Sequence, residues 1–236
     1  MPITTPNEPT LIVFGGTFDP PHDGHIGCVE QALLRFPKAK VYVLPAAQPP
    51  ATGEHLKTVT TSFDHRMAMA QLAFSHLAQR VEVLPLEQDL PRPSFTSNTL
   101  RHLAAALPNE RLGFLLGQDQ WAALPKWHEP RQILQRAHLV VVSRAGSTSL
   151  TEATEQTAAA LGLELTWNPD DASASLGTDS QRTYFITAAV SAAASSSARQ
   201  ALAQHTIGGA AAAWLPPAVT SYIKHHQLYS LPKDQP

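Results

Sequence analysis

What the 236-residue sequence lacks already limits the kinds of protein that it can encode. It has one cysteine, Cys28. No disulfide can therefore form within the chain, and no cluster of thiolates can hold a metal. Cys28 stands in an apolar helical pattern with Ile26, Val29 and Leu33, which is typical of a packing residue.

Charge is also scarce, because charged residues make up 15% of the chain and the net charge is -2 with histidine neutral. An extended basic surface is not expected from this composition, so we expect no nucleic-acid partner. A small anionic ligand needs only a few local cations and backbone amides, and it stays compatible with the composition.

Long hydrophobic runs are missing as well. No apolar run reaches the length of a membrane span, and the first ten residues lack the basic start and apolar core of a signal peptide. We therefore expect a cytoplasmic protein with no membrane partner.

What is present is an alternation of short apolar runs with helical patterns. We expect strands at residues 11–14, 41–44, 81–84, 112–116, 138–142 and 184–186, and helices at about 24–36, 64–79, 97–106, 130–136, 196–205 and 216–227. Most of these strands are continuously apolar, which is typical of a parallel sheet covered on both faces. With right-handed crossovers, the pattern predicts an α/β fold, a Rossmann-like doubly wound parallel sheet with C-terminal helices.

The expected domain organisation is simple. Residues 1–9 and 231–236 are interpreted as tails, and residues 10–230 as a single domain. Residues 145–181 are rich in Ser, Thr, Ala and Asp, with a possible strand at 163–167, and we interpret them as an elaboration on that domain.

The segment after the first strand carries the strongest chemical signal, Gly15-Gly16-Thr17-Phe18-Asp19-Pro20-Pro21-His22-Asp23-Gly24-His25. In an open parallel sheet, ligands bind beyond the carboxyl ends of the strands. Two glycines let the backbone approach a ligand closely, and the following helix directs its free N–H groups at the turn. The segment therefore predicts a phosphate cradle, although it has neither the third glycine of a dinucleotide fingerprint nor the Gly-Lys-Ser/Thr of a Walker loop.

His22 and His25 are three positions apart, which places both on one face at the start of the helix. Two imidazoles at a phosphate cradle can donate hydrogen bonds to phosphate oxygens, or help to bind a metal. An isolated pair with this spacing would be two histidines in a polar loop. The preceding strand and glycine turn favour the phosphate-binding interpretation.

This segment resembles the signature of the nucleotidylyltransferase superfamily, and within it the chain is most similar to the bacterial nicotinate-nucleotide adenylyltransferases. Four later blocks agree with that resemblance, which spans roughly residues 10–229: Ser94-Phe95-Thr96 with Thr99-Leu100; Gly117-Gln118-Asp119 with Pro125 and Trp127; Ala137-His138-Leu139 through Arg144; and Leu215-Pro216, Val219, Tyr222-Ile223 and Leu228-Tyr229.

The resemblance implies transfer of AMP from ATP to nicotinate mononucleotide, giving deamido-NAD and pyrophosphate in NAD biosynthesis. The attacking phosphate oxygen is already anionic, so no general base is required. Positioning and electrostatic stabilisation would then supply most of the rate. Mg²⁺ bound through the ATP phosphates would serve the same end, with no metal site built by the protein alone.

On the ATP side, the resemblance implies catalytic roles for His22, His25 and Arg199. The full set expected to bind ATP is Gly15, Gly16, Thr17, Phe18, His22, His25, Gly117, Asp119, Ser195, Ser196 and Arg199. Residues 193–199 depart from the family's Ile-Ser-x-Thr-x-Ile-Arg block, since alanine stands at 193, 194 and 198. Taken alone, this stretch is equally compatible with an ordinary Ala/Ser-rich helix start.

On the acceptor side, the resemblance implies that Trp127 stacks on the pyridine ring and that backbone N–H groups near Thr96 and His128 bind its carboxylate. His55 and Lys57 would hold the acceptor phosphate, although an apparent four-residue insertion separates them from the Pro-Pro pair of the family block. Asp19 would order the turn or contact the ligand through water. The structural alternatives are a core lid for Trp127 and solvated loop cations for His55 and Lys57.

Three rival functions stay open at this point. Nicotinamide mononucleotide or phosphopantetheine could be the acceptor of the same chemistry, or the chain could be a non-catalytic nucleotide sensor. Trp127 and the Ser-Phe-Thr block argue against phosphopantetheine. The presence of His22, His25 and Arg199 together argues against a sensor.

Overall fold

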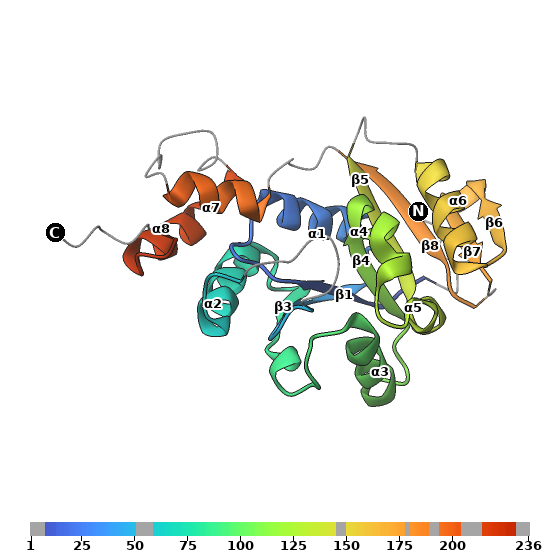
Figure 1. The fold of residues 1–236 in the computed structure, drawn as a ribbon, viewed down its shortest axis with the longest axis horizontal. Coiled ribbons are helices and arrows are strands. Elements are labelled where there is room, and N and C mark those ends of the chain that lie inside the picture. Colours follow the sequence, from blue (N-terminus) through green and yellow to red (C-terminus); the bar gives the residue numbers. More distant parts are fainter. Residues whose placement is uncertain are drawn as a thin grey trace.

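The computed structural model describes residues 8–50, 59–144, 150–177, 180–188, 194–203 and 214–229. In these residues eight strands form one sheet, in the order β3-β2-β1-β4-β5-β8-β7-β6 (Figure 1). The strands are β1 (Leu11–Gly16), β2 (Lys40–Pro45), β3 (Val81–Val83), β4 (Leu112–Gly117), β5 (His138–Arg144), β6 (Leu165–Asn168), β7 (Ser173–Leu176) and β8 (Thr183–Ala188). Neighbouring strands from β3 to β8 run parallel, and β7 and β6 are added antiparallel at the far edge.

Helices cover both faces of the sheet. They are α1 (Asp23–Arg35), α2 (Phe63–Phe74), α3 (Thr96–Ala106), α4 (Gln118–Ala123), α5 (Pro130–Arg136), α6 (Leu150–Leu161), α7 (Ser195–Ala203) and α8 (Pro217–His225). Side chains alternate along β1, so that Ile12 and Phe14 pack with α1, α2, α7 and α8, whereas Leu11 and Val13 pack with α3, α4, α5 and α6. The described residues therefore form two hydrophobic cores, one on each face of the sheet.

The predicted fold class is confirmed, and the apolar runs lie where the strands are. The structure adds elements that we did not predict. Helix α4 has six residues, too few for a periodic pattern to be recognised. Helix α6 and strand β7 lie in the Ser- and Ala-rich stretch, where β7 depends on its pairing with β6 and β8 rather than on its own composition.

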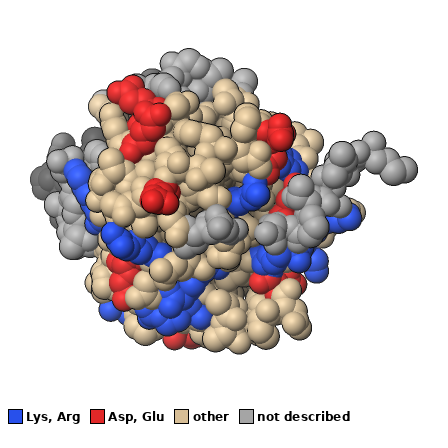
Figure 2. All heavy atoms as spheres, turned by 90° about the vertical axis from the view of Figure 1, so that its right-hand side faces the viewer, with Lys and Arg blue, Asp and Glu red and all other residues tan. Residues whose placement is uncertain are grey.

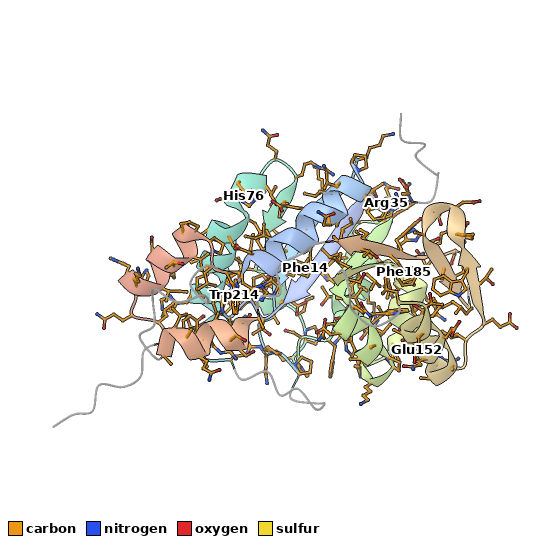
Figure 3. The ribbon with its side chains drawn as sticks, turned by 90° about the horizontal axis from the view of Figure 1, so that it is seen from above. Phe14, Arg35, His76, Glu152, Phe185 and Trp214 are labelled. Atoms are coloured by element: carbon orange, nitrogen blue, oxygen red, sulfur yellow. The ribbon has the colours of Figure 1, made fainter. Side chains whose placement is uncertain are left out.

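The order in which strands are added to the sheet changes direction at β1. β1 lies between β2 and β4, so the crossovers after β1 and those leading to β5 proceed toward opposite edges. Crevices for ligands form at such a switch point, outside the carboxyl ends of the strands. Gly16 and Gly117 end β1 and β4, and both lie at that edge. From above, Phe14 is seen at the centre of the molecule beside α1 (Figure 3).

The face that lies to the right in Figure 1 shows both Lys/Arg and Asp/Glu side chains, separated by uncharged surface (Figure 2). Neither sign covers this face as a continuous patch. Within the described parts of the chain, no helix combines the length and the apolar character needed to cross a bilayer. The cytoplasmic location expected from the sequence stays a prediction.

Candidate functional site

The two glycines that end β1 differ in what packing demands of them. A Cβ at Gly16 would lie 2.9 Å from Cζ of Phe18, which real Cβ atoms do not tolerate. A Cβ at Gly15 would lie 3.6 Å from Cε2 of Phe114, an ordinary contact, and Gly15 is exposed. Packing therefore requires glycine at position 16, whereas position 15 is left open on the side from which a ligand can approach.

Phe18 packs beneath the turn, against the rings of Phe14 and His25. Its backbone has a φ of 52°, a left-handed conformation that is rare for a bulky residue. The ring is 1% exposed and meets the rings of Phe14 and His25 edge to face, with centroids 5.5 and 5.0 Å away. The ring of Phe18 is therefore buried against His25, and the ATP contact expected at Phe18 would have to be made by its backbone.

His22 and His25 lie at the amino end of α1, with His22 as the N-cap residue. Their rings are stacked, with centroids 3.7 Å apart. The backbone N–H of His22 donates to Nδ1 of His25 at 3.2 Å, so in the neutral ring the proton is on Nε2. In that tautomer the donor of the His25 ring is Nε2.

Asp19 lies in the turn, is 1% exposed and accepts several hydrogen bonds through its carboxylate. Its Oδ2 accepts from the backbone N–H and the hydroxyl of Thr60, at 2.7 and 2.9 Å. Its Oδ1 accepts from the hydroxyls of Thr61 and Tyr229, at 2.6 and 2.7 Å. Burial raises the pKa of this carboxyl, but the hydrogen bonds outweigh that effect and lower the pKa, so Asp19 is a carboxylate. This geometry orders the turn; a contact with the mononucleotide stays a prediction.

Arg66 on α2 is buried beneath the same turn. It is 1% exposed, and its Nη1 donates to the backbone carbonyl of Thr17 at 2.8 Å. Burial lowers the pKa of Arg66, and the nearby Asp19 carboxylate opposes that shift. The protein therefore places a buried cation directly under the backbone that is expected to face the phosphates.

Helix α7 reaches the turn from the far end of the sequence. Ser195 donates from its hydroxyl to the carbonyl of Pro20 at 2.9 Å, and Nη1 of Arg199 donates to the carbonyl of Asp19 at 2.6 Å. Ser196 is exposed at the start of the helix. The structure thus brings Ser195 and Arg199 to the histidine segment, as expected, and their contact with phosphate stays a prediction.

Three of the residues expected to bind the acceptor, Thr96, Trp127 and His128, lie near one another. Thr96 is the first residue of α3, after Phe95 as N-cap, which has no side-chain oxygen to cap the helix. The ring of His128 is stacked on that of Phe95, with centroids 4.2 Å apart. Trp127 is half-buried and meets Phe114 edge to face at 6.0 Å. The structure therefore brings Thr96, Trp127 and His128 to one region.

Phe114 on β4 connects the two parts of the candidate site. Its ring lies near Gly15 and also meets the ring of Trp127 edge to face. Gly117 follows at the end of β4 as the N-cap of α4, and Asp119 is exposed in the first turn of that helix. The expected ATP and acceptor residues thus border a common edge of the sheet, while His55 and Lys57 lie outside the described residues.

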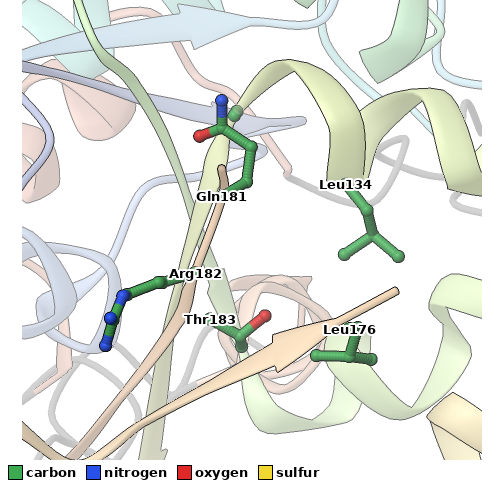
Figure 4. A pocket seen from close by; sticks show the side chains of 6 residues that line it. Leu134, Leu176, Gln181, Arg182 and Thr183 are labelled. Atoms are coloured by element: carbon green, nitrogen blue, oxygen red, sulfur yellow. The ribbon is translucent and has the colours of Figure 1, made fainter. Parts of the chain in front are cut away.

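A separate small hollow, partly open to solvent, lies elsewhere (Figure 4). It is lined by Leu134, Ala137, Leu176, Gln181, Arg182 and Thr183. Ala137 precedes β5 and Thr183 begins β8, so the hollow lies at the amino ends of the parallel strands. Ligands of such sheets bind at the opposite edge, and this hollow is not the candidate site.

With this geometry established, a family model described as cytidylyltransferase-like matches residues 13–199, from within β1 to Arg199. The chain belongs to the cytidylyltransferase-like family. The match begins before the glycine turn and ends at the arginine of α7, so it contains both segments that meet at Asp19.

Within this family the resemblance to bacterial nicotinate-nucleotide adenylyltransferases is confirmed. A relative from Idiomarina loihiensis named "Probable nicotinate-nucleotide adenylyltransferase" is 34% identical over 220 residues, covering 92% of this chain and 98% of the relative. One of the same name from Marinomonas sp. is 34% identical over 226 residues, covering 93% and 94%. One from Albidiferax ferrireducens is 43% identical over 138 residues, covering 58% of this chain and 66% of the relative.

Solved structures agree on the fold. Plasmodium falciparum nicotinic acid mononucleotide adenylyltransferase in complex with NaAD superimposes with a TM-score of 0.69 at 17% identity, covering 94% of this chain and 98% of that one. The complex of the same protein with APC also gives a TM-score of 0.69, at 15% identity. At these identities the likeness establishes the fold of this cytidylyltransferase-like chain and no more.

The surroundings of the turn in this cytidylyltransferase-like chain include residues whose role was not predicted, among them Arg66 and Tyr229. Helical spacing did contain a signal for Arg66, since it lies three and four positions before the buried residues Met69 and Ala70. An arginine on the buried face of a helix needs a polar partner. Tyr229 was noted in the sequence only as part of the last resembling block, and nothing there indicated its partner, which is 210 positions away.

Proposed function

We propose that this chain transfers AMP from ATP to nicotinate mononucleotide, producing deamido-NAD and pyrophosphate in NAD biosynthesis. The observation that carries the proposal is the meeting of His22, His25, Ser195 and Arg199 around the glycine turn at the carboxyl end of β1. The nearly full-length relatives named for this activity support it.

The proposed chemistry needs orientation and charge stabilisation, and no base. A phosphate oxygen of the mononucleotide attacks the α-phosphorus of ATP, and the bond to the pyrophosphate oxygen breaks. His25 donates from Nε2 to a non-bridging oxygen of the α-phosphate, where negative charge is redistributed during the transfer. The amino end of α1 and the guanidinium of Arg199 balance the charge of the phosphates, and Arg199 favours departure of pyrophosphate.

We assign Mg²⁺ to the ATP phosphates. Among the described residues, no group of three or more His, Cys, Asp or Glu side chains is arranged to hold a metal ion. Mg²⁺ commonly keeps its waters and binds through substrate phosphates. The ATP phosphates would therefore supply its ligands in a site whose own groups are histidines, backbone amides and an arginine. When bound, it would neutralise phosphate charge and polarise the P–O bonds.

The acceptor site favours a ring that carries a carboxylate. The first N–H groups of α3, beginning at Thr96, receive no side-chain cap, because Phe95 is the N-cap residue. An anionic carboxylate gains more from helix N-terminal donors than a neutral amide does. Trp127 would stack on the pyridine ring, the backbone near His128 would complete the carboxylate site, and His55 and Lys57 would hold the acceptor phosphate.

We also propose that residues 10–230 form a single domain. All strands in the described residues belong to one sheet, and α7 and α8 pack with α1 and α2 in the same core. The described part of residues 145–181 contributes α6, β6 and β7 beside β8.

Pyrophosphate release tests the proposed function directly. The purified chain is mixed with ATP, Mg²⁺ and one acceptor at a time: nicotinate mononucleotide, nicotinamide mononucleotide or phosphopantetheine. We expect release with the first, weaker release with the second and none with the third. The His25→Ala variant serves as the control for contaminating activity. If none of the three acceptors yields pyrophosphate, the proposed function is wrong, and a preference for the amide would reject the assignment of the acid.

A further inference from the structure

The chain reverses direction immediately after α8. Gln227 and Tyr229 have φ values of 52° and 63°, so two non-glycine residues within three positions are left-handed. This conformation is disfavoured for side chains with a Cβ, and most of all for a bulky one. At Gln227 it belongs to an ordinary helix end, because the N–H of Leu228 donates to the carbonyl of Ile223 at 3.0 Å. At Tyr229 it persists because the surrounding contacts require it.

The reversal directs the side chain of Tyr229 back into the protein. Leu228 and Tyr229 pack against the core that contains α1 and α2, and the hydroxyl of Tyr229 lies 4.0 Å from Sδ of Met69. The same hydroxyl donates to Oδ1 of Asp19 at 2.7 Å. Burial and the adjacent carboxylate raise the pKa of Tyr229, so it keeps its proton and remains a donor.

Asp19 links Tyr229 to the candidate site, because it belongs to the segment that leads into the histidine pair. It precedes His22 by three positions, and its carboxylate is held at the amino end of α2 by Thr60 and Thr61. Its carbonyl accepts from Arg199. The position of the segment that leads into the histidine pair therefore depends on how the buried Asp19 side chain is held.

We propose that Tyr229 is a positioning residue of the nucleotidyl-transfer site, acting through its hydrogen bond to Asp19. The inference rests on the proposed function, and it adds to that function a residue that touches neither ATP nor the acceptor. The C-terminal turn thereby aligns His22 and His25 with the phosphates.

A purely structural role makes a different prediction. If Tyr229 only packed the end of the chain onto the core, loss of its hydroxyl would lower the melting temperature and leave kcat of the folded enzyme unchanged. A positioning role predicts that kcat of the folded enzyme falls, whatever the change in melting temperature. The turnover falls because the transition state demands alignment, while the KM for ATP changes little.

The test compares Tyr229→Phe with Tyr222→Phe in the full chain. Tyr222 is a matched control, because it lies on α8 and its hydroxyl is 3.0 Å from Nδ1 of His65, without contact to Asp19. We expect Tyr229→Phe to lower kcat about fivefold, the factor that corresponds to one ordinary hydrogen bond, with the KM for ATP within about twofold of wild type. Tyr222→Phe should leave kcat within about twofold.

A double-mutant cycle then tests whether Tyr229 acts through Asp19. We expect Tyr229→Phe to have no further effect on kcat in an Asp19→Ala background. Multiplying effects would overturn the proposal, as would equal kcat values for Tyr229→Phe and Tyr222→Phe. If Asp19→Ala does not fold, the comparison of the two tyrosine variants still decides. An inactive wild-type protein would overturn the proposed function, whereas an active one with unaffected variants would overturn this inference alone.

Discussion

His138 provides a test of the core that positions the site, through the pH dependence of stability. It begins β5 and is 2% exposed. Its Nδ1 accepts the backbone N–H of Arg182 at 3.0 Å, which requires that nitrogen to be unprotonated. Burial first, and then the positive charges of Arg111 and Arg182, lower the pKa of His138 from 6.5 to about 4.

The sign of the effect follows from proton counting. Between pH 6.5 and about pH 4, the unfolded chain binds a proton at His138 and the folded chain does not. Stability therefore falls as the pH falls through this window, and it is unaffected above it. The shift of about 2.5 pKa units corresponds to roughly 3 kcal/mol, at about 1.4 kcal/mol per unit.

The variant His138→Asn removes the titrating ring and keeps an acceptor for the N–H of Arg182. We expect urea unfolding of the wild-type protein to lose about 3 kcal/mol more than that of the variant between pH 7 and pH 4. His76→Asn is the control, because His76 is exposed and 3.3 Å from Glu30. Parallel stability curves for wild type and His138→Asn would refute the argument.

Three further predictions concern the candidate site. His25→Ala should lower kcat by at least about a hundredfold with little change in ATP affinity, since its bond strengthens in the transition state; equal losses in both would make it a binding residue only. Trp127→Ala should raise the KM of the mononucleotide about tenfold and leave that of ATP unchanged; an unaltered mononucleotide KM would remove Trp127 from the site. Gly15→Ala should weaken ATP binding, measured by calorimetry, without lowering the melting temperature. Gly16→Ala should lower the melting temperature in thermal unfolding, because its Cβ would meet Phe18.

Features encoded by neighbouring residues could be predicted from the sequence, and features that depend on distant residues could not. The strands of the parallel sheet were placed because burial on both faces requires continuous apolar runs, which can be read locally. The short helix α4 and the strand β7 were missed because neither has a pattern of its own. Strand β7 exists through its pairing with β6 and β8.

The candidate site likewise contains residues that could be predicted from the sequence and residues that could not. The segment from Gly15 to His25 was evident because its glycines, turn and histidines are contiguous. Arg199 could be suggested only by resemblance, and the structure brings it to the carbonyl of Asp19. The burial of Arg66 and the bond from Tyr229 to Asp19 were not anticipated, because each depends on a surface that forms only when distant helices pack.

The sequence by itself therefore determined the fold class and the segment where phosphates are expected to bind, since these depend on periodicity and on neighbouring residues, and its resemblance to known sequences indicated the family. Only the tertiary structure decided how that segment is held. The glycine turn is fixed by Arg66 from α2, by Ser195 and Arg199 from α7, and by Tyr229 beyond α8. Hydrogen bonds between residues up to 210 positions apart leave no periodic trace in a single sequence, because they are specified by packing in three dimensions.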